Sequence, residues 1–167
     1  MNSFARKICL LGDFSVGKTS AVARYVRSTF SESYLTTVGV KVDTKVVDLV
    51  ARPSMRLVLW DIAGSSKLGQ SRLNYVAGAH GFVLVADGTR RDTVSSALDL
   101  WQQAAEALNA DVPAVLLVNK VDLADEWDIS PELIESLSHN LAVFCTSAKT
   151  GESIELAFAE IAGAVSL

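Results

Sequence analysis

The chain is poor in the residues that staple or kink a protein. It has 2 cysteines and 3 prolines among 167 residues, and aromatic residues make up only 7% of it. Cys9 and Cys145 fall in separate predicted strands, so we expect reduced, buried thiols that act as small hydrophobes. This pattern argues against a disulfide framework and against a cysteine metal site.

Long hydrophobic runs and clustered positive charge are also missing. No apolar run approaches the roughly 20 residues of a membrane-spanning helix, and the run within residues 1–11 is too short for a secretory signal. The formal charge is −4, and Lys and Arg are scattered along the chain. This argues against nucleic acid or an anionic membrane as a partner. These absences predict a cytoplasmic protein.

Lipidation signals are absent as well. Asn2 stands where N-myristoylation needs glycine, and residues 164–167 hold no cysteine for a prenyl group and no basic tail. Both routes of covalent lipid attachment depend on those residues. We therefore expect no direct membrane anchor in this chain.

What is present favours one compact domain. Hydrophobic residues make up 50% of the chain, which is ample for a single core over residues 1–167, and we expect a monomer. The predicted strands are 4–11, 38–50, 54–61, 81–87, 114–119 and 142–146, and the predicted helices are 18–28, a short one ending at 77, 93–108, 131–138 and 153–165. A short turn joins the second and third strands, so they pair antiparallel, whereas the others alternate with helices. We expect an α/β fold with a six-stranded, mostly parallel sheet and helices on both faces.

The segment from Gly12 to Thr19, Gly-Asp-Phe-Ser-Val-Gly-Lys-Thr, directly follows the first strand. It fits the pattern G-x-x-x-x-G-K-[ST], in which a glycine-rich turn lets backbone N–H groups surround phosphates at a helix N-terminus. Lys18 would bridge the β- and γ-phosphates, and the Thr19 hydroxyl would ligate Mg²⁺. The alternative, an ordinary glycine-rich turn, leaves the buried-facing Lys18 without a purpose.

A second motif, Asn119-Lys120-Val121-Asp122, ends the fifth strand. The Asp122 carboxylate can accept hydrogen bonds from N1–H and the 2-amino group of guanine. Adenine offers neither donor there, so it would leave a buried Asp122 unpaired, a mismatch that discriminates by about 10⁴-fold or more. Taken alone, the segment could be an ordinary strand-to-turn sequence, but the upstream phosphate motif makes that alternative weak.

From residue 4 to residue 165 the chain resembles the Ras superfamily of small GTP-binding proteins, most of all its Rab-like branch. Besides the two motifs above, residues 34–40 resemble the first switch, residues 60–64 (Trp-Asp-Ile-Ala-Gly) the start of the second, and residues 146–149 (Thr-Ser-Ala-Lys) the last guanine loop. The resemblance implies the fold of a P-loop NTPase G-domain that binds GTP or GDP with Mg²⁺.

The resemblance also assigns roles residue by residue. Thr37 would give its hydroxyl to Mg²⁺ and its N–H to the γ-phosphate, Asp61 would hold a Mg²⁺-bound water, and Gly64 would offer its N–H to the γ-phosphate. Phe30 would lie against the guanine edge, although a plain core role fits it equally well. The implied nucleotide-binding set is Gly12, Asp13, Phe14, Ser15, Val16, Gly17, Lys18, Thr19, Ser20, Phe30, Thr37, Gly64, Asn119, Lys120, Asp122, Ser147, Ala148 and Lys149.

Two positions depart from the family pattern. The glutamine that usually follows Asp-x-x-Gly and orients the attacking water is Ser65, which is too short to reach, and a small P-loop residue is replaced by the bulky Phe14. The Phe14 ring would crowd the space that a catalytic water or a partner's arginine finger would use, unless it points outward and packs on a switch. Gln70 is an alternative source of the missing amide, but its register is wrong. The implied catalytic group is thus Lys18, Thr37, Gly64 and the degenerate Ser65.

Two functions of different class follow. The first is a slow GTPase switch that signals through switch I (residues 31–40) and switch II (residues 61–76) to a protein effector, with an exchange factor and an activating protein as further partners. The second is a pseudo-GTPase, a partner-binding module with negligible turnover. A third, an ATP-using P-loop enzyme, is disfavoured by Asn119 and Asp122.

Overall fold

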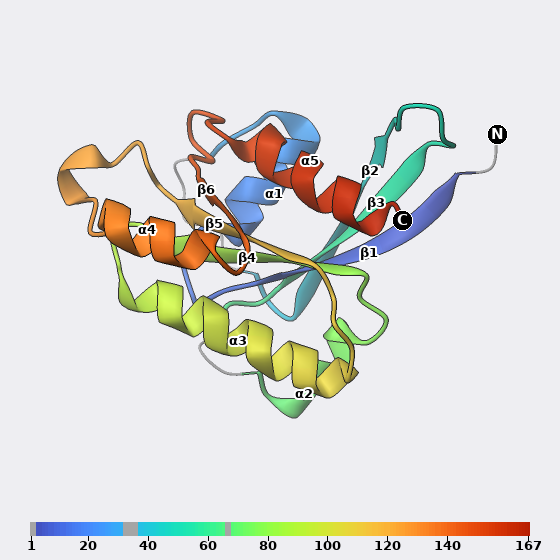
Figure 1. Cartoon of the computed structure of the whole chain (residues 1–167), viewed down its shortest axis with the longest axis horizontal. Coiled ribbons are helices and arrows are strands. Elements are labelled where there is room, and N and C mark those ends of the chain that lie inside the picture. The colour runs from blue at the N-terminus through green and yellow to red at the C-terminus, as the bar shows by residue number, and fades with distance from the viewer. Residues whose placement is uncertain (1–2, 32–36, 66–67) are drawn as a thin grey trace.

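One six-stranded sheet with helices around it forms the molecule (Figure 1). The computed structural model describes residues 3–31, 37–65 and 68–167. The elements are β1 (Phe4–Leu11), α1 (Lys18–Arg27), β2 (Val40–Val47), β3 (Met55–Ile62), α2 (Gln70–Val76), β4 (Gly81–Asp87), α3 (Asp92–Leu108), β5 (Ala114–Asn119), the 3₁₀ turn η1 (Ala124–Glu126), α4 (Pro131–Ser138), β6 (Ala142–Cys145) and α5 (Ile154–Val165). The predicted α/β class is confirmed.

The strand order within the sheet is β2-β3-β1-β4-β5-β6. Only β2 and β3 pair antiparallel in that sheet, and the other described neighbours are parallel. β1 stands where the order reverses, between β3 and β4. In open α/β sheets, the carboxyl ends of the strands at such a reversal form the crevice in which ligands bind. The P-loop segment leaves β1 at this point.

The helices cover both faces of the sheet. α1 and α5 lie on one face, and α2, α3 and α4 lie on the other (Figure 1). The central strand β4 is buried along its whole length, and its side chains alternate between two cores because successive residues point to opposite faces. Val83 and Val85 join the core under α1 and α5, whereas Leu84 and Ala86 join the core under α3. None of the described helices is long and apolar enough to cross a membrane.

The connection between β2 and β3 is wider than predicted. Strands were expected over 38–50 and 54–61, but β2 ends at Val47 and β3 begins at Met55. Ala51 takes a left-handed conformation with φ +57°, and the Ser54 hydroxyl donates to Asp48 across the connection at 2.8 Å. The turn signal was therefore placed correctly, but this side-chain bond closes the loop earlier than the apolar pattern indicates.

The two cysteines lie in strands that β4 and β5 separate. Cys9 in β1 is fully buried, whereas Cys145 in the edge strand β6 is only half-buried, and both are free thiols. The expectation that both are buried is thus wrong for Cys145, because an edge strand has a neighbour on one side only.

Candidate functional site

A cavity of about 510 Å³ opens at the carboxyl ends of β1, β3, β5 and β6. This volume lies in the range of about 300–1,000 Å³ that small-molecule sites occupy. The residues that line it are Phe14, Ser15, Val16, Gly17, Lys18, Thr19, Ser20, Phe30, Ser31, Thr37, Ala63, Gly64, Arg72, Asn119, Lys120, Asp122, Leu123, Ala148 and Lys149. The cavity thus brings together residues of all five sequence motifs, which are far apart along the chain.

Gly17, the residue before Lys18, cannot be replaced by a larger residue, because of its backbone conformation and its close contact with Asn119. Gly17 has φ +103°, and a Cβ on it would lie 2.3 Å from the Asn119 amide nitrogen. Any larger residue would strain the backbone and push Asn119 away. That amide nitrogen donates to the Val16 carbonyl at 3.1 Å, and Lys120 Nζ donates to the Ser15 carbonyl at 2.9 Å. The motif at the end of β5 therefore holds the loop after β1.

Lys18 is a buried ammonium group inside the loop. It is 6% exposed, and its Nζ donates to the carbonyls of Gly12 at 3.1 Å and Asp13 at 3.2 Å. Burial lowers the pKa of Lys18 to about 8, against the opposing charges of Asp61 and Asp13. A buried cation gains from an anionic partner that replaces its lost hydration. The site is therefore suited to an anion such as a phosphate.

Three side-chain oxygens meet beside Lys18. Thr19 Oγ1 lies 2.5 Å from Asp61 Oδ2 and 2.6 Å from Thr37 Oγ1, and Thr37 Oγ1 lies 3.3 Å from the same carboxylate. Asp61 is 1% exposed, and its other oxygen, Oδ1, is buried without a hydrogen-bond partner among the described residues. Burial raises the pKa of Asp61, against hydrogen bonds from Thr19 and the charge of Lys18.

These oxygens fit a magnesium site. Mg²⁺ prefers hard oxygen ligands and keeps several waters, and an unpaired buried carboxylate oxygen is costly unless a cation or water satisfies it. Thr19 and Thr37 would ligate the ion directly, and Asp61 would hold one of its waters. Its chemistry there would be to neutralise phosphate charge.

The opposite end of the cavity is built by the loops after β5 and β6. The Ser147 hydroxyl donates to Asp122 Oδ1 at 2.8 Å. Asn119 Oδ1 accepts from the Ala148 N–H at 3.2 Å and from the Thr146 hydroxyl at 3.1 Å. Asp122 was expected to be buried, but it is exposed, because it lines the open cavity. Ser147 lies behind it and is fully buried.

Several predicted residues lie next to the cavity and not on its wall. Gly12, Asp13, Asp61, Ser147 and Ser65 are not among the lining residues. The backbone N–H of Ser65 donates to the Gly12 carbonyl at 3.2 Å. This backbone bond joins the loop after β3 to the loop after β1, and Ser65 is not on the wall of the main cavity.

The two aromatic residues in question both line the main cavity. Phe30 is 37% exposed, so the alternative of a plain core role is wrong for it. Phe14 is 52% exposed although it also lines the cavity. A Cβ on Gly64 would lie 2.7 Å from the Phe14 Cα, so the loop after β3 lies directly on the P-loop. Of the predicted switches, residues 32–36 and 66–67 lie outside the described residues.

Sequence reasoning missed several contributors. Arg72 of α2 lines the cavity and donates to the Ala63 carbonyl at 3.1 Å, and Arg24 of α1 donates to the carbonyls of Ala148 at 2.8 Å and Lys149 at 2.5 Å. No motif marks either arginine. Asp87, which ends the buried strand β4, had a signal that was overlooked, because the carboxyl end of a central strand is where ligand loops gather.

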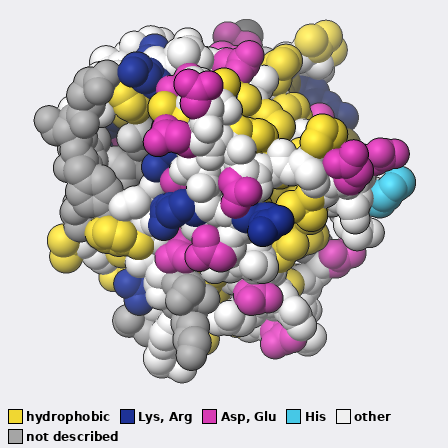
Figure 2. Space-filling view, turned by 90° about the vertical axis from the view of Figure 1, so that its left-hand side faces the viewer, with side chains coloured by type: hydrophobic (Ala, Val, Ile, Leu, Met, Phe, Trp, Pro, Cys, Tyr) yellow, Lys and Arg dark blue, Asp and Glu magenta, His cyan; other side chains and the backbone are white. Residues whose placement is uncertain are grey.

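The surface around the cavity is mixed in charge. Figure 2 shows the side that lies at the left in Figure 1, and on it Lys and Arg side chains are interspersed with Asp and Glu. The cations that line the cavity itself are Lys18, Arg72, Lys120 and Lys149.

Comparison with known proteins places the chain among relatives of one kind. The sequence model of the Ras family matches residues 7–166. The chain is 32% identical over 162 residues to Ras-related protein Rab-1 of Theileria parva, an alignment that covers 95% of this chain and 73% of that protein. It is 37% identical over 156 residues to Ras-related protein Rab-32 of Homo sapiens, covering 89% and 69%. With GTP-binding protein ypt1 of Schizosaccharomyces pombe it shares 31% identity over 156 residues, covering 91% and 75%.

Proposed function

The chain belongs to the Ras family of small GTP-binding proteins, and we propose that it is a guanine-nucleotide switch that binds GTP and GDP with Mg²⁺ and hydrolyses GTP slowly. One observation carries the proposal. A single cavity joins the buried ammonium of Lys18, the oxygens of Thr19 and Thr37 and the carboxylate of Asp122. These are the groups that phosphate, Mg²⁺ and guanine need.

The phosphates would occupy the cradle at the start of α1. The N-terminus of α1 adds the positive end of its dipole, and Lys18 loses its carbonyl partners in favour of phosphate oxygens. Thr37 and Gly64 come from the two predicted switch segments and lie on the same cavity. A γ-phosphate would hold both segments, and its loss would release them, which makes a two-state switch. Effector, exchange and activating proteins would bind there.

The base would occupy the other end. Ser147 holds one oxygen of Asp122 at 2.8 Å, which orients the carboxylate toward the N1–H and 2-amino donors of guanine. Phe30 and Lys120 line the same cavity and offer an aromatic edge and an aliphatic stem to the base. A bound base would bury Asp122, so adenine, which offers it no donor, would leave the buried carboxylate unpaired.

Hydrolysis would be slow for two reasons. Ser65 does not line the main cavity, and its side chain is too short to orient a water against the γ-phosphate. Phe14 brings a ring to the cavity wall where the family carries a small residue. Most of the protein's contribution to this reaction is positioning and charge stabilisation. Lys18 still stabilises charge, so turnover would be reduced and not abolished. A partner-binding module without turnover is the second candidate, and the same two residues favour it.

Thermal unfolding with different nucleotides tests the proposal. Millimolar GDP or GTP with Mg²⁺ should raise the melting temperature strongly, because ligand at about 1,000 times its Kd adds about 4 kcal/mol of stability. ATP at the same concentration serves as the matched control and should do little. An equal shift with ATP would contradict the assignment of guanine.

A further inference from the structure

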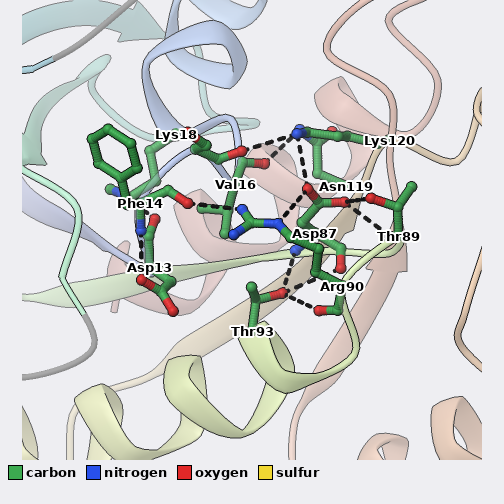
Figure 3. A network of polar contacts seen from close by, with 11 residues as sticks. Asp13, Phe14, Val16, Lys18, Asp87, Thr89, Arg90, Thr93, Asn119 and Lys120 are labelled. Carbon is green, nitrogen blue, oxygen red and sulfur yellow. Dashed lines mark hydrogen bonds and ion pairs between the residues drawn. The ribbon is translucent and has the colours of Figure 1, made fainter.

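A buried carboxylate outside the predicted motifs organises the loop after β1 (Figure 3). Asp87 is 1% exposed. Its Oδ2 accepts from Lys120 Nζ at 2.8 Å and from Arg90 Nε at 3.1 Å, and its Oδ1 accepts from the Thr89 N–H and hydroxyl at 2.9 and 2.7 Å. Burial alone raises the pKa of Asp87, but the hydrogen bonds from Lys120 and Thr89 outweigh it and lower the pKa. Asp87 is therefore a charged anchor.

Three successive carbonyls of the P-loop are each held by a side-chain nitrogen from outside the loop. The pairs are Arg90 with Phe14 (2.7 Å), Lys120 with Ser15 (2.9 Å) and Asn119 with Val16 (3.1 Å). Asn119 and Lys120 belong to the motif that ends β5. Arg90 lies just before α3 and belongs to none of the motifs, yet its bond is the shortest of the three.

Holding a carbonyl fixes the amide that shares its peptide group. In a trans peptide the C=O and N–H point in opposite directions, and the described residues contain no cis peptide bond. With the carbonyls of residues 14, 15 and 16 held on one side, the N–H groups of Ser15, Val16 and Gly17 point to the other. Those three residues line the main cavity. The external donors thus aim a run of amides at the place where phosphates would bind.

We propose that Arg90 is a positioning residue of the phosphate cradle: braced by Asp87, it holds the Phe14 carbonyl so that the Ser15 N–H faces the phosphates of the bound nucleotide. This inference rests on the proposed function. It assigns to Arg90 a task that Asn119 and Lys120 perform for the next two peptide groups. The contact is to the backbone oxygen of Phe14, so it does not depend on the Phe14 side chain.

The first test is nucleotide release from the full chain. Fluorescently labelled GDP, bound with Mg²⁺ and chased with excess unlabelled GDP, should leave the Arg90→Ala variant about tenfold faster than wild type, which is the usual worth of one hydrogen bond to a charged group. Arg91→Ala is the matched control, because Arg91 is an exposed neighbour, and it should release GDP at the wild-type rate. Wild-type release from Arg90→Ala would overturn the inference.

Two further measurements separate positioning from general loosening. Thr89→Val removes a hydrogen bond to Asp87 but leaves the Phe14 contact, so it should accelerate release less than Arg90→Ala; equal acceleration would overturn the role of the Phe14 carbonyl. Arg90 acts on the phosphates, so the ratio of inosine diphosphate to GDP affinity should stay at the wild-type value in Arg90→Ala. A ratio that changes as much as the release rate would show that Arg90→Ala disturbs the loops after β5 and β6, where the base binds, and would overturn the proposal.

Hydrogen exchange supplies a readout that does not depend on turnover. In the GDP-loaded protein, amides of segment 12–19 should exchange faster in Arg90→Ala than in Arg91→Ala, and identical exchange would count against the inference. Failure of the proposed function looks different, because then wild type itself would not retain GDP. Retention by wild type with unchanged release from Arg90→Ala would refute the inference alone.

Discussion

Lys18 is nine-tenths removed from solvent and has backbone carbonyls as its acceptors. Replacing it by alanine removes the charge-assisted contacts to the phosphates. We expect Lys18→Ala to lose nucleotide during purification, whereas Thr19→Ala should retain it more weakly and with less dependence on Mg²⁺. The measurement is the nucleotide content of each purified protein, determined chromatographically with and without a chelator. Tight GDP retention by Lys18→Ala would refute the phosphate cradle.

Ser65 and Phe14 form the second residue-level question. If Ser65 leaves the attacking water unoriented, hydrolysis loses on the order of 10²-fold relative to a positioned water. Single-turnover hydrolysis should therefore be faster in Ser65→Gln than in wild type, and fastest in the double variant with Phe14→Gly, which also clears the cavity wall. Arg91→Ala serves as the control, because Arg91 is exposed and does not line the cavity.

Two outcomes would change that interpretation. A wild-type rate equal to that of either variant would mean that another residue positions the water. Retained GTP with no measurable hydrolysis in any variant would favour the partner-binding module over the slow switch. Both can be read from the same samples.

At the scale of elements, the two thiols report the order of the strands. Cys9 lies in the interior strand β1, where burial raises its pKa to about 12, and Cys145 lies in the half-covered edge strand β6. The thiolate is the reactive form. A thiol reagent at neutral pH should therefore label Cys145 first and Cys9 only as the protein opens.

The variant Cys145→Ser is the control, and it should show a single slow phase. After denaturation the wild type should yield both thiols. Rapid native labelling of the Cys145→Ser variant would mean that β1 is not the interior strand, which contradicts the sheet order.

His80 fastens the segment before β4 to β1. The His80 imidazole Nδ1 accepts from the backbone N–H of Lys7 at 2.8 Å. The backbone N–H of His80 donates to the Lys7 carbonyl at 2.8 Å. Burial, together with the charges of Arg6 and Lys7, lowers the pKa of His80. The unfolded chain then takes up a proton more readily than the folded one, so stability falls as pH drops below the ordinary value of about 6.5 and is unaffected above it.

Urea unfolding at pH 7.5 and pH 5.5 checks this sign. Wild type should lose more unfolding free energy between the two pH values than His80→Asn, whose amide oxygen can accept the same N–H without titrating. The difference should be modest because His80 is exposed. An equal loss in both proteins would show that His80 does not carry the effect.

The elements themselves were largely predictable. Buried strands such as β4 and β5 are continuous apolar runs, and their bounds agree with the predicted 81–87 and 114–119. The end of β2 and the start of β3 could not be predicted, because the hydrogen bond between Ser54 and Asp48 that closes the loop is not visible in the pattern of apolar residues. η1 was missed for a related reason, since a three-residue 3₁₀ turn is too short for periodicity to show.

In the molecule as a whole, the order of the strands in the sheet brings the residues of the site together. Motifs that are remote in sequence meet because parallel strands end at one edge, and this could be inferred from where each motif follows its strand. The hydrogen bonds that connect the loops could not be inferred from the sequence. Arg24 in α1 donates to the carbonyls of residues 148 and 149, and Arg90, just before α3, donates to the carbonyl of residue 14. Such contacts join single side chains to backbone carbonyls, and the acceptor has no sequence signature.

Recognition of guanine by Asp122 can be measured by calorimetric titration of wild type and Asp122→Asn with GDP and xanthosine diphosphate, each with Mg²⁺. Wild type should bind GDP by far the more tightly, because the carboxylate accepts from N1–H and the 2-amino group, whereas xanthine presents an oxygen there. The asparagine amide offers a donor to that oxygen, so the preference should reverse in the variant while the phosphate contacts stay the same. If Asp122→Asn keeps the wild-type preference for GDP, Asp122 does not select the base, and the assignment of guanine recognition to this residue is wrong.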